Sequence, residues 1–131
     1  IGLIDSYKAL PNDHSKKPVL KQSIINFAKV VLQFQNENGS WNWIVNEASA
    51  QADSSATSTL MWLLANVPID DQKYEECQNA VNKALSYLQN VTRRNGAVDF
   101  SQGDTKAIGI HAKDFDILPF TQGFVLRTIS I

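Results

Sequence analysis

The run from residue 53 to residue 66 is apolar on almost every side once its first turn is passed. Polar side chains dominate that first turn, from Asp53 to Ser58, and every residue from Leu60 to Ala65 is apolar. A helix that is apolar all round is normally buried. In a chain of 131 residues, burial on all sides requires other helices around it. We therefore predict a buried helix over 53–66 whose polar first turn lies at a buried rim.

Two segments on either side of this run carry apolar residues on one face only. The segment 18–34 has them at three- and four-residue spacings, and Pro18 suits a first helical turn, where its missing N–H is not needed. The segment 72–91 has a similar stripe after Asp70 or Asp71, either of which can cap a helix. Both are predicted to be amphipathic helices that cover the outside of the fold. The expected core-facing residues are Leu20, Ile24, Phe27, Ala28, Val31 and Leu32 in the first segment and Tyr74, Cys77, Val81, Leu85 and Leu88 in the second.

The chain repeats this order of elements once. An amphipathic helix, the residues from Gln35 to Trp41, a loop and a buried helix are followed by an amphipathic helix, the residues from Gln89 to Val98, a loop and a mostly apolar helix from about residue 120. The offset of roughly 55 residues is typical of helical-hairpin repeats. Residues 1–10 add the tail of a further helix. The pattern predicts an all-α fold, an arc of a two-layered helical ring, and makes the chain a part of one domain.

Composition and charge narrow the classes of partner. The net charge is −1, whereas nucleic acid and anionic membranes both require a concentrated basic surface, so neither is an expected partner. No apolar run approaches the ~20 residues of a membrane span. The single cysteine, Cys77, excludes an intramolecular disulfide and fits a reducing compartment, so we expect a cytoplasmic protein and leave a secreted one open. His14 and His111 lack partners at metal-ligand spacing, and neither a metal nor a cofactor is expected.

Several segments stand in the order and spacing of a known family. They are Ile1-Gly-Leu-Ile-Asp-Ser-Tyr-Lys-Ala-Leu-Pro-Asn-Asp-His14, Gln33-Phe-Gln35 with Gly39-Ser-Trp41, Asp53-Ser-Ser-Ala-Thr-Ser58, Gly96-Ala-Val98 and Gly103-Asp-Thr105. In these segments the chain resembles the C-terminal part of the unsaturated uronyl hydrolases, which are glycoside hydrolase families 88 and 105 and include the unsaturated rhamnogalacturonyl hydrolases. The resemblance covers nearly the whole chain. It implies a partial (α/α)6 toroid built of helical hairpins, of which residues 1–131 are the C-terminal portion.

The same resemblance implies a reaction and a substrate. Family members take oligosaccharides that end in an unsaturated uronic acid, the product of polysaccharide lyases in pectin degradation. An Asp protonates the enol ether, water adds across the C4–C5 double bond, and the ring opens to release the next sugar. That Asp belongs to a Met-Trp-x-Asp segment, whereas Met61-Trp62 continues here as Leu63-Leu64. We therefore expect this chain to supply a wall of the pocket in a bacterial enzyme and no catalytic residue.

A loop over residues 101–111 is the first place where substrate contacts are expected. It carries Gly103, Asp104, Thr105 and Lys106, and in the family the loop at this position contacts the uronate carboxylate. Glycine lets a backbone come close to a ligand and present its N–H groups. Asp104 departs from the small neutral or hydroxyl residue that is common there, and its charge would repel a carboxylate. Thr105 and Lys106 can still bind one.

The first turn of the predicted buried helix is the second place. Asp53 is positioned to cap this helix. Ser54 and Ser55 follow it, and two interpretations of their hydroxyl groups stay open. They either complete the network that caps the helix or face a sugar at the rim of the pocket.

Two other classes of function are compatible with the pattern. One is a non-catalytic carbohydrate-binding or interaction domain derived from the toroid. The other is a toroid with different chemistry, such as an epimerase or a cyclase, because Gln35-x-x-x-Gly39-x-Trp41 matches the Gln–Trp motif of terpene cyclases. In both settings the Gln amide ties a helix end to the next turn while the Trp packs beneath it. A partial ring also leaves apolar flanks uncovered, so a homodimer through these edges is expected. The expected uncovered residues include Leu3, Ile4, Phe124, Val125, Leu126 and Ile129.

Overall fold

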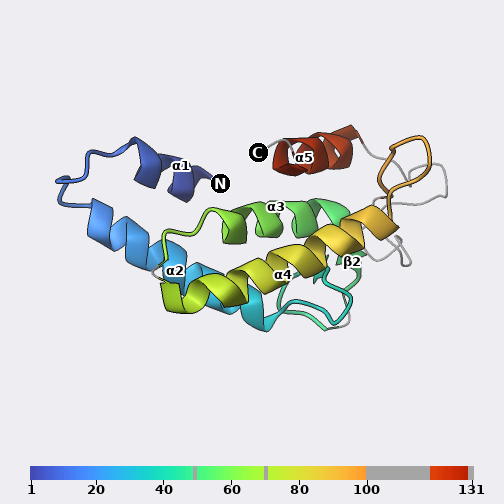
Figure 1. Cartoon of the computed structure of the whole chain (residues 1–131), viewed down its shortest axis with the longest axis horizontal. Helices are drawn as coiled ribbons and strands as arrows, with labels where there is room; N and C mark the ends of the chain where they lie inside the picture. The colour runs from blue at the N-terminus through green and yellow to red at the C-terminus, as the bar shows by residue number, and fades with distance from the viewer. Residues whose placement is uncertain (49, 70, 100–118, 130–131) are drawn as a thin grey trace.

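The computed structural model describes residues 1–48, 50–69, 71–99 and 119–129, and these residues form helices and one short ladder (Figure 1). The two strands pair antiparallel, with Trp41 opposite Asp53. The helices confirm the predicted all-α fold: the first four begin and end within one residue of their expected ranges, and the last begins one residue before its expected start. The elements are α1 (Gly2–Ala9), α2 (Lys17–Gln33), β1 (Trp41–Asn42), β2 (Ala52–Asp53), α3 (Ser54–Ala65), α4 (Asp71–Asn90) and α5 (Pro119–Ile129).

Helix α3 lies between two groups of helices. In Figure 1, α1 and α5 run along one side of α3, and α2 and α4 run along the other. The most extensive contacts between helices join α3 to α4 and to α5. Arg127 Nη2 of α5 lies 3.9 Å from Asp5 Oδ2 of α1, so the first and last described helices approach each other beside α3. The amphipathic helices α2 and α4 thus form one layer, and α1, α3 and α5 form the other, which are the two layers that the sequence predicts (Figure 1).

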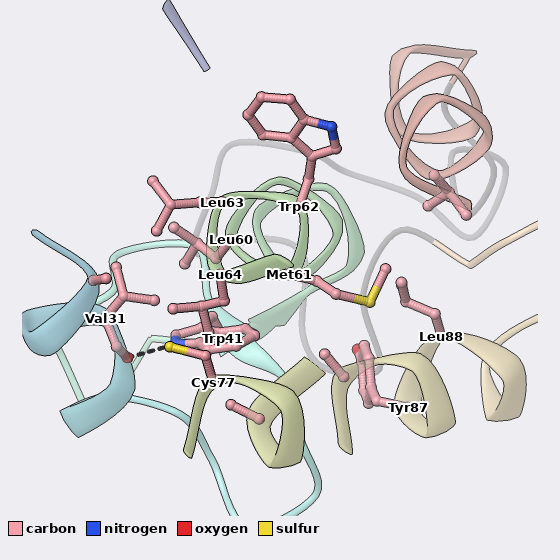
Figure 2. Packing of buried hydrophobic residues seen from close by; sticks show 14 of the residues in the cluster. Val31, Trp41, Leu60, Met61, Trp62, Leu63, Leu64, Cys77, Tyr87 and Leu88 are labelled. Atoms are coloured by element: carbon pink, nitrogen blue, oxygen red, sulfur yellow. Dashed lines mark hydrogen bonds between the residues drawn. The ribbon is translucent and has the colours of Figure 1, made fainter. Parts of the chain in front are cut away.

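The central position of α3 explains its composition. Nine of its residues are buried, and they include the polar side chains of its first turn as well as the apolar side chains that follow: Ser54, Ser55, Thr57, Ser58, Leu60, Met61, Trp62, Leu63 and Leu64. The prediction of a helix buried on all sides is therefore confirmed. Figure 2 shows how Leu63 and Leu64 point toward Val31 of α2, while Met61 points toward Leu88 of α4.

The predicted apolar stripes of the two outer helices are wrong in part. On α2, Ile24, Ala28 and Val31 are buried as expected, but Phe27 is 48% exposed. On α4, Cys77 and Leu88 are buried as expected. The side chains of Tyr74 and Leu85 are instead exposed, and the buried face of α4 consists of Cys77, Ala80, Ala84, Tyr87 and Leu88. Small alanine side chains let α4 approach its neighbours closely, whereas a stripe chosen by side-chain size favours the larger residues.

The connection from α2 to β1 is held by Gln35 and Trp41. Gln35 Nε2 donates to the carbonyl oxygens of Gly39 at 3.0 Å and of Ala80 in α4 at 2.8 Å. Trp41 is fully buried, and its Nε1 donates to the carbonyl oxygen of Val31 at 2.8 Å (Figure 2). The amide therefore joins the end of α2 to the following turn and to α4 while the indole packs beneath. This confirms the interpretation of the Gln–Trp motif.

We call the residues 36–41 the first turn. Asn36 N donates to the carbonyl oxygen of Ser40 at 2.9 Å, and Gly39 N donates to that of Asn36 at 2.9 Å. Asn38 Oδ1 accepts from Ser40 N at 3.0 Å. Gly39 has a φ of +89°, and a Cβ placed on it would lie 2.2 Å from the main-chain oxygen of Lys83. Only glycine fits here, because the turn presses directly against the backbone of α4.

We call the residues 93–98 the second turn, which follows α4. Arg93 N donates to the carbonyl oxygen of Ala97 at 2.7 Å, and Gly96 N donates to that of Arg93 at 2.9 Å. Asn95 Oδ1 accepts from Ala97 N at 3.1 Å. Gly96 has a φ of +85°, but a Cβ placed on it would meet no atom within 4 Å. The two turns of the predicted repeat therefore match in their individual hydrogen bonds, in different surroundings.

The second turn is joined to α5 by one side chain. Gln122 Oε1 accepts from Val98 N at 2.8 Å, and Gln122 Nε2 donates to Val98 O at 2.6 Å. Both main-chain groups of Val98 are satisfied in this way, so α5 is fixed at its beginning to the end of the second turn. Among the described helices, none combines the length and apolar character that crossing a membrane requires.

Candidate functional site

The N-terminal turn of α3 is the most polar buried region that the structure describes. Asp53 is the N-cap residue, and its Oδ1 accepts from Ala56 N at 2.6 Å and from Ser55 Oγ at 2.6 Å. These contacts satisfy one of the free N–H groups at the helix start. The predicted capping role of Asp53 is confirmed.

The remaining hydroxyl groups of this turn also donate within the protein. Thr57 Oγ1 donates to the carbonyl oxygen of Asp53 at 2.7 Å and accepts from Trp41 N at 2.9 Å. Ser54 Oγ donates to the carbonyl oxygen of Asp99 at 2.5 Å, and Ser58 Oγ donates to that of Ser55 at 3.0 Å. The network joins α3 to Trp41 of the first turn and to Asp99, the residue after the second turn. A cap network is therefore present, and contact of Ser54 or Ser55 with a substrate stays a prediction.

Two polar atoms at the base of this network have no hydrogen-bond partner among the described residues. They are Asp53 Oδ2 and the Tyr87 hydroxyl oxygen, and both side chains are buried. Burial raises the pKa of Asp53, against the hydrogen bonds from Ser55 and from the N–H groups of Ala56 and Ser55. Burial also raises the pKa of Tyr87, and the nearby Ser54 hydroxyl opposes this rise. Desolvation disfavours the charged form in each case.

A cleft of about 340 Å³ opens beside the same turn. Two exposed aromatic rings belong to its lining: Trp43, which follows β1, is 47% exposed, and Phe124 of α5 is 37% exposed. Ser55 is the member of the cap network that also lines the cleft. No charged side chain is part of the described lining, which consists of Trp43, Val45, Ser55, Ala56, Thr59, Leu60 and Phe124.

A second cleft, of about 380 Å³, lies toward the other end of α3. Trp62 forms part of it, and Lys8 Nζ of α1 and Arg127 Cζ of α5 lie 5.7 Å and 5.9 Å from the centre of its ring. Such distances fit cation–π contacts. Lys8 Nζ also donates to Asn66 Oδ1 at 2.6 Å. These contacts connect α1, α3 and α5. The predicted uncovered flank is wrong for Ile4 and Val125, which are buried; Leu3, Phe124, Leu126 and Ile129 are exposed as expected. The homodimer through this flank stays a prediction.

The predicted substrate-binding loop belongs to the segment between Asp99 and α5. Gly103, Asp104, Thr105 and Lys106 lie outside the described residues, so their expected role in binding a carboxylate stays a prediction. The residues on either side of residues 100–118 are placed. Asp99 contacts Ser54 at the start of α3, and Gln122 contacts Val98.

Sequence reasoning missed the residues that shape the first cleft. Trp43 and Phe124 belong to segments far apart in the chain, and only the fold brings them to one lining. An aromatic residue two positions after the Gln–Trp tryptophan was the available signal for Trp43. Phe124 was expected only as part of an uncovered flank.

Other candidate chemistry has a structural explanation. Met61 and Trp62 lie inside the buried helix α3, as expected from the sequence. Cys77 is buried in the core, and burial, together with the charge of Glu76, raises the pKa of its thiol, so packing explains it better than nucleophilic chemistry. Within the described part of the chain, no group of three His, Cys, Asp or Glu side chains is arranged to hold a metal ion.

Comparison with protein families gives one match that spans most of the chain. Residues 1–123 match the model of Glycosyl Hydrolase Family 88. Among curated proteins, none matches the chain significantly.

Solved structures with the same arrangement of helices come from related families. A possible member of the GH105 family from Salmonella enterica serovar Paratyphi A aligns with a TM-score of 0.75 at 15% identity, covering 98% of this chain and 35% of that chain. A family 88 glycosyl hydrolase from Bacteroides vulgatus aligns with a TM-score of 0.74 at 18% identity, covering 95% and 37%. A chain described as a polysaccharide lyase aligns with a TM-score of 0.72 at 23% identity, covering 95% and 37%. These likenesses establish the helical toroid fold, and the chain spans little more than a third of the length of those proteins.

Proposed function

Because the chain belongs to glycosyl hydrolase family 88, we propose that it forms one wall of the sugar pocket of an unsaturated uronyl hydrolase. Such an enzyme removes unsaturated uronic acid from lyase-generated oligosaccharides by hydrating the C4–C5 double bond. The chain accounts for about a third of the length of the solved structures that it resembles. The activity is therefore proposed for the longer protein, and the catalytic Asp is expected outside residues 1–131.

The observation that carries this proposal is the aromatic cleft at the N-terminus of α3. Flat aromatic side chains offer a large apolar contact area, and the carbon-bound hydrogens of a sugar ring form a matching apolar face. Trp43 and Phe124 present such surfaces, with the hydroxyl groups of Ser55 and Thr59 beside them. Ligand sites typically combine an apolar lining with a few polar groups of this kind.

The lack of charge in the described lining indicates which part of the substrate the cleft holds. A uronate carboxylate would need a cationic or N–H partner, and the cleft's described side chains include no Lys, Arg or His. We assign the cleft to the neutral sugar next to the uronate. The carboxylate is assigned to the predicted contacts of Thr105 and Lys106.

The first experiment uses the complete protein and an unsaturated uronyl disaccharide. Loss of ultraviolet absorbance from the C4–C5 double bond measures turnover. Trp43→Ala should raise KM, because it removes the apolar surface under the sugar. Ile44→Ala is the matched control, since Ile44 is also 47% exposed and is not part of the cleft lining. Equal kinetics for Trp43→Ala and Ile44→Ala would contradict the assignment of the cleft.

A second experiment addresses the proton donor and the carboxylate contact. Residues 1–131 alone should not turn over the disaccharide, because a positioned proton donor contributes typically ~10²–10⁴-fold to the rate. In the complete protein, Thr105→Ala should weaken substrate binding, whereas Asp104→Asn should be neutral or favourable. Turnover by residues 1–131 alone would contradict the missing acid, and unchanged kinetics of Thr105→Ala would contradict the loop assignment. Sugar binding by the complete protein without turnover would support the alternative, a non-catalytic carbohydrate-binding domain.

A further inference from the structure

The first and second turns each contain an asparagine followed by a glycine with positive φ. These pairs are Asn38-Gly39 and Asn95-Gly96. In such pairs the main-chain nitrogen of the glycine can attack Cγ of the asparagine side chain. A C–N bond forms, the Cγ–Nδ2 bond breaks, and ammonia leaves with the proton of the glycine N–H. The resulting succinimide ring takes up one water molecule at either carbonyl and opens to aspartate or isoaspartate.

Both asparagine side chains are activated to a similar degree. Asn95 Oδ1 accepts a hydrogen bond from Ala97 N, which polarises the amide carbonyl that is to be attacked. Asn38 Oδ1 accepts from Ser40 N and from Ser40 Oγ at 2.7 Å. In both turns the glycine N–H must first leave a hydrogen bond of 2.9 Å to a main-chain oxygen. These local contacts do not favour Asn95 over Asn38.

The surroundings of the two glycines differ much more. Gly39 presses against the main-chain carbonyl of Lys83, and Ser40 beside it is fully buried. Asn38 itself is exposed, but ring closure there would have to displace Gly39 from the main chain of α4. Gly96 has no neighbour within 4 Å of a built Cβ, and both Asn95 and Gly96 are exposed. Local opening at an exposed turn costs little, whereas opening at a packed one approaches the cost of global unfolding.

From this difference we propose that Asn95 is a site of spontaneous deamidation in the folded protein and that Asn38 is protected from it. The reaction needs only water and no enzyme. Its main product, isoaspartate, adds one carbon to the main chain and one negative charge inside the second turn.

The modification has a structural consequence for α5. Val98 lies at the end of the second turn, and both of its main-chain groups are bound by Gln122. A longer main chain at position 95 changes the register between Arg93 and Ala97, whose backbone hydrogen bond closes the turn. Val98 then no longer meets Gln122 in the same position, so the start of α5 is released from the second turn.

The test ages the whole folded protein at mildly alkaline pH and follows both sites by peptide mass spectrometry. A parallel sample in denaturant supplies the intrinsic rates. In the folded sample, the peptide with Asn95 should lose its amide and separate into two isomeric products while the peptide with Asn38 stays unchanged. In denaturant both should convert. Conversion of Asn38 as fast as Asn95 in the folded sample would overturn the proposal, as would retention of both amides in a folded sample whose denatured counterpart converts.

Amide hydrogen exchange then tests the consequence. Exchange at Val98 should accelerate in aged wild-type protein and should stay unchanged in equally aged Asn95→Gln, whose longer side chain cannot close the five-membered ring. Unchanged exchange at Val98 in wild-type protein with Asn95 fully converted would overturn the proposed release of α5. The comparison of fresh with aged wild-type protein does not depend on the folding of Asn95→Gln.

Discussion

The turn after α2 and the turn after α4 share their main-chain hydrogen bonds, but only in the first does the glycine pack against the backbone of another helix. In the first turn, Ser40 and Trp41 are fully buried and Gly39 contacts the backbone of α4. In the second turn, the corresponding Gly96 faces open space. A short sequence pattern is therefore enough to form the turn. Its importance for stability is set by what packs on it.

The two turns are also anchored by different means. Trp41 reaches from the first turn into the core and donates to the carbonyl of Val31. Val98 at the end of the second turn is held through its main chain by Gln122 of α5. A turn that supplies its own anchor depends on a large side chain. A turn that is held by another helix depends on that helix staying in place.

Truncation of the two anchoring residues should give the largest difference in stability between the two turns. Trp41→Ala should lower the free energy of unfolding by about 3–5 kcal/mol, because it leaves a large cavity in the core. Val98→Ala should cost roughly 1–2 kcal/mol, at about 0.8 kcal/mol per buried methylene-sized group. Urea unfolding of both variants measures the difference. Equal losses would show that the second turn is as deeply integrated as the first.

Alanine substitution of the two glycines tests the backbone contact. Gly96→Ala should cost about 1–2 kcal/mol, the strain of a left-handed residue with a side chain. Gly39→Ala carries the same strain, and its Cβ would also lie 2.2 Å from the main-chain oxygen of Lys83. It should therefore be the more destabilising of the two in urea unfolding. A smaller loss for Gly39→Ala would contradict the close packing of the first turn against α4.

The pH dependence of Asp53→Asn tests the buried carboxyl that pairs with the first turn. Burial raises the pKa of Asp53 in the folded protein, so the folded state binds a proton more tightly than the unfolded state. The stabilisation that comes from this tighter proton binding is fully present below the ordinary carboxyl pKa of about 4. It is lost as the pH rises through the raised pKa of Asp53. The stability of the wild type relative to Asp53→Asn should therefore fall with increasing pH. A relative stability that grows over this range would indicate a lowered pKa.

Lys83→Ala should have the smallest effect, within about 0.5 kcal/mol, as for other exposed positions. Gly39 approaches the main-chain oxygen of Lys83, and the side chain of Lys83 is exposed. Its removal leaves the contact intact. A thermal melt would reveal a larger loss, and that result would mean that the lysine side chain itself supports the first turn.

The sequence was sufficient for the features that depend on neighbours in the chain. The helix ranges, the Asp53 cap and the local tie that Gln35 makes to Gly39 and Trp41 makes to Val31 follow from periodicity and from short motifs. Which face of α4 is buried does not follow from these, because Ala80 and Ala84 pack inward and Tyr74 stays outside. Close approach of helices favours small side chains, and a search for large apolar ones overlooks them.

The candidate site was predictable only where its residues are adjacent in sequence. The polar N-terminal turn of α3 was recognised from the sequence. Its partner Asp99 lies 45 residues away from Ser54, and this contact depends on the fold. The same is true of the cleft, which joins Trp43 to Phe124. The expected contacts of Gly103 to Lys106 lie outside the described residues and stay predictions.

The uneven burial of the three tryptophans gives the protein an internal optical probe. Trp41 is fully buried and Trp62 nearly so, whereas Trp43 is 47% exposed at the edge of the first cleft. A quencher dissolved in water, such as acrylamide or iodide, should therefore act mainly on the emission of Trp43. A sugar that occupies the cleft should shield this emission and leave that of the two buried rings unchanged, so occupancy can be followed by fluorescence without a label.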